Sequence, residues 1–209
     1  MSAQLAIFES STVAMIQKSE LFVQYLIDSL GDYSSIIGIE TRDQAMGMVL
    51  GVTYRDYPEP GLTTGITYGL SAASHPEWKD YKPELCITVE SINDDWVSAV
   101  SRLVEWNRSN HSFMPGSLFH YGNVIASDTQ MDSFLVFNAG IGEAAHIGPT
   151  FAPPIQLADE TIRIFQVYPL YHDEVEMIRK VGIRKFTGLR EYAPYNVQRP
   201  DLSKIYQVG

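Results

Sequence analysis

Apolar residues recur every three or four positions in three stretches of the chain, which is the spacing of one face of a helix. Residues 93–95, Asn-Asp-Asp, suit a helix start because they can cap it and place negative charge in the first turn. Gly31 and Gly188 stand where helices commonly end, and Gly182 weakens the last stretch. The sequence therefore predicts helices over residues 11–30, 96–108 and 172–189.

Segments rich in β-branched and aromatic residues lie between these helices and are separated by prolines and glycines. They predict strands at residues 36–40, 47–54, 63–70, 84–90, 134–137 and 162–167. Short connections between successive strands favour antiparallel pairing. Residues 143–156 hold three prolines and are expected to form an irregular loop. The tail at residues 191–209 is expected either to lie over the body or to hang loose.

The predicted fold class is therefore α+β, with a mixed, mostly antiparallel sheet packed with about three helices. We find neither an internal repeat nor a linker that would divide the chain. A chain of 209 residues can bury enough surface to fold without a disulfide or a metal. We expect a single domain over residues 1–209.

The net charge of the chain limits the kinds of molecule that it is expected to bind. The chain carries 15 Lys and Arg against 25 Asp and Glu, for a formal net charge of −10. Phosphate backbones and anionic lipids attract basic proteins, so we expect neither nucleic acid nor membrane as a partner. A basic protein partner would be attracted, although the charge also serves solubility. Because the chain has a single cysteine and no evident signal peptide or membrane span, we expect a cytoplasmic protein.

No pattern in the sequence predicts a catalytic, cofactor or metal site. Residues 140–145 match a loose dinucleotide-binding pattern, but the prolines that follow leave no room for the helix which that chemistry requires. Cys86 lies within an apolar strand and is expected to be a small core residue. His172 and Glu176 have helical spacing, but a solvated helix start explains them better. The five histidines show no metal-binding spacing; they are His75, His111, His120, His146 and His172.

Five short segments resemble, in order and approximate spacing, those of the suppressor of fused (SUFU) family. They are residues 67–71 (Thr-Tyr-Gly-Leu-Ser), 82–87 (Lys-Pro-Glu-Leu-Cys-Ile), Trp96, 113–117 (Phe-Met-Pro-Gly-Ser), and 164–171 with the acidic start of the last helix. The resemblance covers about residues 63–189. It implies a SUFU-like α+β domain that binds another protein.

Within that family, eukaryotic members hold zinc-finger transcription factors of the Gli type between two lobes, and bacterial relatives are proposed as immunity proteins against polymorphic toxins. This chain resembles only the N-terminal lobe, and its size is similar to the bacterial single-domain type. Tyr68 and Glu84 are the predicted partner-binding residues, since an aromatic ring and a carboxylate can serve an interface. We expect structural roles for the other motif residues, Gly69, Leu70, Trp96, Pro115 and Gly116.

Three hypotheses about function follow. The first is a non-catalytic protein-binding domain, with immunity against a basic toxin as its specific form. The second is an enzyme with an unrecognised carboxylate and histidine site around His111, His120 or His146, which a pocket with converging titratable groups would support. The third is a structural assembly subunit, which a large exposed apolar patch would support.

Overall fold

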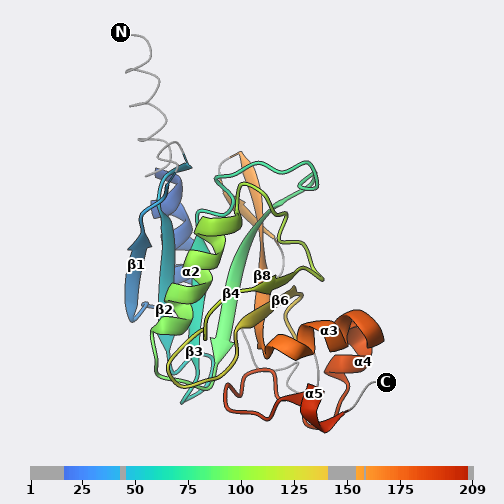
Figure 1. Ribbon diagram of the computed structural model, residues 1–209. Coiled ribbons are helices and arrows are strands. Elements are labelled where there is room, and N and C mark those ends of the chain that lie inside the picture. Colours follow the sequence, from blue (N-terminus) through green and yellow to red (C-terminus); the bar gives the residue numbers. More distant parts are fainter. Residues whose placement is uncertain (1–16, 43–45, 141–153, 158, 207–209) are drawn as a thin grey trace.

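The computed structural model describes residues 17–42, 46–140, 154–157 and 159–206. A single twisted sheet forms its centre, and helices lie on both faces (Figure 1). The strands are β1 (Ser35–Ile39), β2 (Val49–Arg55), β3 (Thr63–Tyr68), β4 (Lys82–Val89), β5 (Leu118–His120), β6 (Ser133–Phe137), β7 (Ile155–Leu157) and β8 (Glu160–Leu170). The helices are residues 17–30, α2 (Asp95–Asn107), α3 (His172–Val181), α4 (Ile183–Thr187) and α5 (Leu202–Ile205).

The sheet has the strand order β1-β2-β3-β4-β8-β6-β5, with β7 paired to β8 outside this path. Strands β1 to β4 form an antiparallel meander. The pairing of β4 with β8 is parallel and joins Lys82–Ile87 to Ile162–Val167 in register. All other strand pairs are antiparallel. The sheet is therefore mixed and mostly antiparallel, which confirms the predicted fold class.

The two faces of the sheet are covered differently. Helix α2 packs its buried stripe, which includes Trp96, Val100 and Leu103, on one face of the meander. On the other face the N-terminal helix inserts Phe22 and Leu26 over β2, β3 and β4. Helices α3 to α5 cover the part of that same face formed by β6 and the end of β8. The protein therefore has three layers, with the sheet in the middle.

Helix α2 approaches the sheet closely because two facing strand positions are glycines. A Cβ atom on Gly65 would lie 2.5 Å from Cγ2 of Val97, and one on Gly51 would lie 2.6 Å from Oγ of Ser101. Both distances are too short for real contacts, so any side chain at these positions would push the helix away from β2 and β3.

The structure adds short elements that the sequence did not predict. Strand β5 follows the turn at Pro115, β7 overlaps the segment expected to be irregular, and α5 lies within the tail. The last predicted helix is divided into α3 and α4 by Gly182, which has a φ of 85°. The start of α2 agrees with the prediction in part: Oδ1 of Asn93 accepts a hydrogen bond from the Asp95 N–H at 2.9 Å, and Asp95 places negative charge in the first turn. Asp94 is the N-cap residue, but its carboxylate binds Arg55 and caps no N–H group.

Two predictions stay open. The sheet is continuous from β1 to β5 across the described residues, but the prediction of one domain over residues 1–209 includes segments outside them. Residues 141–145 of the loose dinucleotide-binding pattern and His146 also lie outside the described part of the chain. In that described part, no helix has the length and apolar content needed to cross a bilayer.

We predict that Gly65→Ala lowers the free energy of unfolding by about 1–3 kcal/mol, because the added methyl group overlaps Val97. Urea denaturation followed by circular dichroism measures the change. Adding Val97→Ala to Gly65→Ala should recover part of the loss relative to the sum of the two single variants. Simple additivity of the two losses would contradict this account of the close approach.

Candidate functional site

The carboxylate of Glu84 is fully buried at the start of β4 and is surrounded by hydrogen-bond donors. Its Oε1 accepts hydrogen bonds from the backbone N–H groups of Gly69 (2.7 Å) and Ser71 (2.9 Å) and from the Ser71 hydroxyl (2.7 Å). Its Oε2 accepts a fourth from the Thr67 hydroxyl at 2.7 Å. Burial raises the pKa of Glu84, while these hydrogen bonds act in the opposite direction. This side chain therefore fixes the chain reversal that follows β3.

Gly69 occupies a position that other residues do not fit. Its φ is 129°, and a Cβ atom there would lie 2.9 Å from the carbonyl oxygen of Met48. Its own carbonyl oxygen accepts a 2.7 Å hydrogen bond from Arg108, a guanidinium that is almost fully buried and also binds Gly47 and Thr41. Gly69 thus connects Glu84 on one side with Arg108 on the other.

The two predicted partner-binding residues lie in different environments. The carboxylate of Glu84 has no solvent contact and acts on the loop after β3. Tyr68 is half-buried, and its ring packs against Phe22 with 4.9 Å between centroids. Burial raises the pKa of the Tyr68 hydroxyl. Contact of either residue with a partner stays a prediction, and for Glu84 it would require the loop at residues 69–71 to open.

The other motif residues lie in the core or in a turn. Leu70 and Trp96 are fully buried in the core beneath α2, and the Trp96 indole donates to Oδ1 of Asp128 at 3.1 Å. Gly116 has a φ of 101°, and its N–H donates to the carbonyl oxygen of Val136 at 2.7 Å, so the turn after Pro115 starts the pairing of β5 with β6.

A second buried carboxylate, that of Glu174, was not identified from the sequence. Glu174 looked like one of several acids at a helix start, but it is fully buried and forms a two-pronged ion pair with Arg199 of the tail, at 2.5 and 2.7 Å. It also accepts hydrogen bonds from the N–H groups of Tyr171 and Leu202. The tail therefore lies over the body as far as it is described, to residue 206.

The groups considered for catalysis are mostly explained by packing. Cys86 is buried and burial raises its pKa to about 12, as expected for an unreactive core thiol. His111 packs against Phe119, and His75 against Trp78. Glu176 pairs with Arg179 rather than with His172. A hollow of about 410 Å³ lies along the N-terminal helix, and Glu20 is the one ionisable side chain among the described residues that line it.

The structure brings together three polar side chains that are far apart in sequence: His120, Asp132 and His172. Spacing along the chain could not reveal them, because three different elements supply them. The strand register, had it been known, would have revealed them. His120 is opposite Ser133, next to Asp132, and Ser133 is opposite Leu170, two residues before His172.

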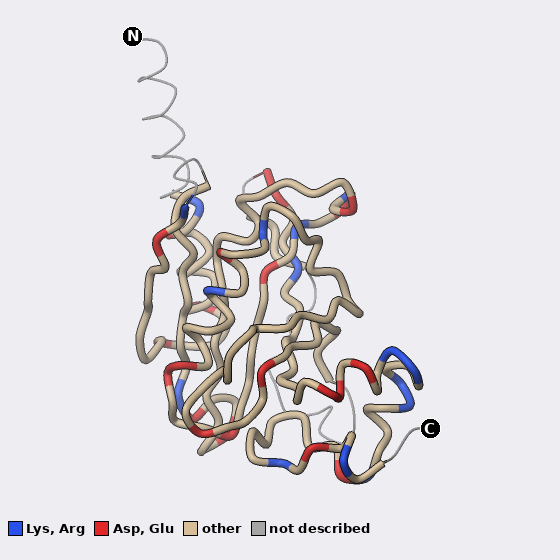
Figure 2. The backbone as a smooth tube through the Cα atoms, in the orientation of Figure 1, with Lys and Arg blue, Asp and Glu red and all other residues tan. Residues whose placement is uncertain are grey.

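Exposed acidic residues gather at the end of the sheet where β2 and β4 finish. Figure 2 shows them below the start of α2. We call this region the acidic edge; it comprises Asp32, Asp56, Glu59, Glu90, Asp94 and Asp95. Ile92, between Glu90 and Asp94 in the sequence, is 81% exposed. Arg55 also lies there and is held by the carboxylate of Asp94 and the carbonyl oxygen of Ile92.

Basic residues are concentrated elsewhere. Arg179 and Lys180 of α3, with Arg184 and Lys185 of α4, are exposed on the opposite side of the molecule from the acidic edge (Figure 2). The charge of the protein is therefore unevenly distributed over its surface.

Residues 46–201 match the family described as Suppressor of fused protein (SUFU). The chain belongs to the suppressor of fused family. The match confirms the resemblance noted in the sequence and extends it on both sides of residues 63–189. No curated protein matches the sequence of this SUFU chain.

Solved structures of SUFU proteins share its fold. A putative SUFU homologue from Neisseria gonorrhoeae superimposes with a TM-score of 0.58 at 11% identity, over 81% of this chain and 86% of that one. The Sufu-Fu complex crystal structure contains a chain with a TM-score of 0.55 at 11% identity, with 93% of both chains covered. Drosophila Suppressor of Fused gives 0.52 at 12% identity and covers 77% of this chain but 44% of the fly protein. This chain therefore spans less than half the length of the fly protein.

We predict that Glu84→Gln lowers the free energy of unfolding of this SUFU domain by about 1–3 kcal/mol, because an amide nitrogen would face a hydrogen-bond donor in a buried site. The matched control is Glu77→Gln in the exposed loop before β4, which should change the free energy of unfolding by less than about 0.5 kcal/mol. Equal effects of the two substitutions in urea denaturation would show that the Glu84 network does not stabilise the fold.

We also predict that Arg199→Met lowers the free energy of unfolding by about 3–5 kcal/mol, because it leaves the buried Glu174 carboxylate without its partner. The double variant Arg199→Met/Glu174→Met should be more stable than Arg199→Met alone. Arg179→Met, which removes an exposed ion pair with Glu176, serves as the control and should cost about 0–1 kcal/mol. A double variant that is less stable than Arg199→Met would argue against this explanation.

Proposed function

We propose that this chain is a non-catalytic protein-interaction domain. The observation that carries the proposal is its membership of the suppressor of fused family, supported by a fold like that of a chain in the Sufu-Fu complex. The burial of Cys86 and the engagement of Glu84 and Glu174 in structural hydrogen bonds agree with it, because these groups stabilise the fold and are not accessible to a substrate.

The acidic edge is the surface that we assign to the partner. Of its six exposed carboxylates, Asp94 is paired with Arg55, and the other five attract a basic protein and speed the encounter. Complementary charge also favours such a partner over acidic ones. Ile92 supplies an apolar side chain that a partner could remove from water, as the centre of an interface requires. Arg55 donates a hydrogen bond to the backbone carbonyl oxygen of Ile92. The Ile92 backbone is therefore held in place before a partner binds.

The specific form of the proposal is immunity in a bacterial cytoplasm. The partner would then be a basic toxin, such as one that acts on nucleic acids, since a protein that binds phosphate backbones is rich in Lys and Arg. The acidic edge would cover the active site of the toxin and block it by shape and by charge.

The first test is affinity purification of the tagged protein from its native lysate, with the partner identified by mass spectrometry. Binding of the purified partner is then measured at several salt concentrations. We expect a basic partner whose affinity falls as salt rises. The paired variant Glu90→Gln/Asp95→Asn should weaken binding by about tenfold, mainly through slower association.

The matched control is Glu77→Gln/Asp80→Asn, which removes two exposed carboxylates from the loop before β4. Its affinity should stay close to that of the wild type. Equal weakening by both pairs would place the interface elsewhere, and a partner that is neither basic nor salt-sensitive would overturn the assignment of the acidic edge. If the partner is not a toxin, the immunity form fails while protein binding stands.

A further inference from the structure

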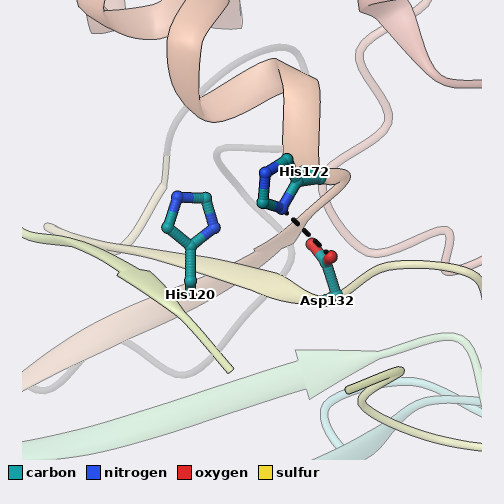
Figure 3. Close-up of side chains that lie close together, drawn as sticks. All are labelled: His120, Asp132 and His172. Carbon is teal, nitrogen blue, oxygen red and sulfur yellow. Dashed lines mark ion pairs between the residues drawn. The ribbon is translucent and has the colours of Figure 1, made fainter. Parts of the chain in front are cut away.

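The end of β5, the start of β6 and the start of α3 meet at one point on the molecule and place two imidazoles beside a carboxylate (Figure 3). His120 is the last residue of β5, Asp132 immediately precedes β6, and His172 is the first residue of α3, directly after β8. Backbone hydrogen bonds connect the three positions, since Tyr121 N–H donates to Asp132 and Asp132 N–H donates to Leu170. Side chains held by strand ends and a helix start keep their spacing better than those on a free loop.

The side-chain geometry is close to that of a metal centre. One possible ligand atom from each residue lies within 4.8 Å of the other two. Nδ1 of His172 is 3.3 Å from Oδ2 of Asp132, which is already the separation of roughly 3.3–3.5 Å expected between two ligands of a tetrahedral zinc ion. The rings of His120 and His172 are stacked, with 4.4 Å between centroids. Small side-chain rotations would bring all three atoms to a common centre.

A fourth residue holds two of these groups in place. The hydroxyl of Ser133 donates to Oδ1 of Asp132 at 2.8 Å and contacts Nδ1 of His120 at 2.9 Å. It therefore fixes one oxygen of the carboxylate while the other faces His172. Metal-binding carboxylates and imidazoles in proteins are usually held by such outer hydrogen bonds, which set the orientation of the ligand.

The geometry points to a binding site for a divalent transition-metal ion of the zinc class, with His120, Asp132 and His172 as ligands. Imidazole nitrogen selects zinc and its neighbours, whereas magnesium and calcium prefer all-oxygen sites. Three protein ligands leave a coordination position for water or for a group from another molecule. The side chain of His172 is 63% exposed, so an ion can reach the site from solvent. The site is independent of the function proposed above, because none of its residues belongs to the acidic edge.

Metal binding at this site would tie the start of α3 to the end of β5 and the start of β6. It would add to the constraint from the neighbouring Glu174, which anchors the tail to the same helix. A bound ion should therefore raise the melting temperature of the protein, by an amount that grows with the logarithm of the ion concentration once this exceeds the dissociation constant.

The test is calorimetric titration of the chelator-treated full chain with Zn²⁺, with Co²⁺ absorption as a report on coordination and Mg²⁺ as a negative probe. We expect one Zn²⁺ per chain, a visible Co²⁺ band typical of tetrahedral nitrogen and oxygen ligands, and no heat from Mg²⁺. His120→Ala, His172→Ala and Asp132→Asn should each weaken Zn²⁺ binding by roughly 100-fold or more, and Ser133→Ala by about 10- to 100-fold.

The matched control is His111→Ala, which removes an exposed histidine outside the cluster and should leave Zn²⁺ affinity and the Co²⁺ band unchanged. The circular dichroism of every variant is compared with that of the wild type, so that loss of binding is separated from loss of fold. The proposal is overturned if the folded wild type binds no Zn²⁺, or if His111→Ala lowers the affinity as much as His120→Ala and His172→Ala do.

Discussion

Much of this fold depends on the buried carboxylate of Glu84. It lies under the loop that follows β3 and has no cationic side chain among its direct partners. Glu84 can be accommodated there because two N–H groups and two hydroxyls replace the water that it loses. Arg108 holds the other side of the same loop through the carbonyl oxygen of Gly69. The two buried side chains act on one glycine from opposite directions, and together they join β2, β3, β4 and the end of α2.

This arrangement explains why the sequence predicted the family more readily than the roles of its residues. Hydrophobic spacing identified the long elements, and the order of the motifs identified the family. However, a Glu that precedes a run of apolar residues has the same local pattern whether it faces solvent or lies inside. The donors of Thr67 and Ser71 decide between these alternatives, and they become neighbours of Glu84 only through the pairing of β3 with β4.

The same limit applies to the second buried carboxylate and to the histidine cluster. Glu174 resembles its neighbours Asp173 and Glu176 in sequence, and only the folding back of the tail sets it apart by bringing Arg199 to it. His120 and His172 are separated by 51 intervening residues in the printed sequence, and the register of β5, β6 and β8 brings them together. Spacing rules describe sites built on one helix or one turn, so they miss sites at which several elements end.

The parallel pair at the centre of the sheet has a consequence for how the chain reaches this state. Strands β1 to β4 and α2 are neighbours in sequence and can assemble through short-range contacts. Strand β8 follows β4 by about 70 residues, so the loop closure that unites the two halves comes at a large entropic cost. During synthesis β4 is therefore an unpaired edge of the meander until β8 has left the ribosome, and in that interval it can pair with other chains.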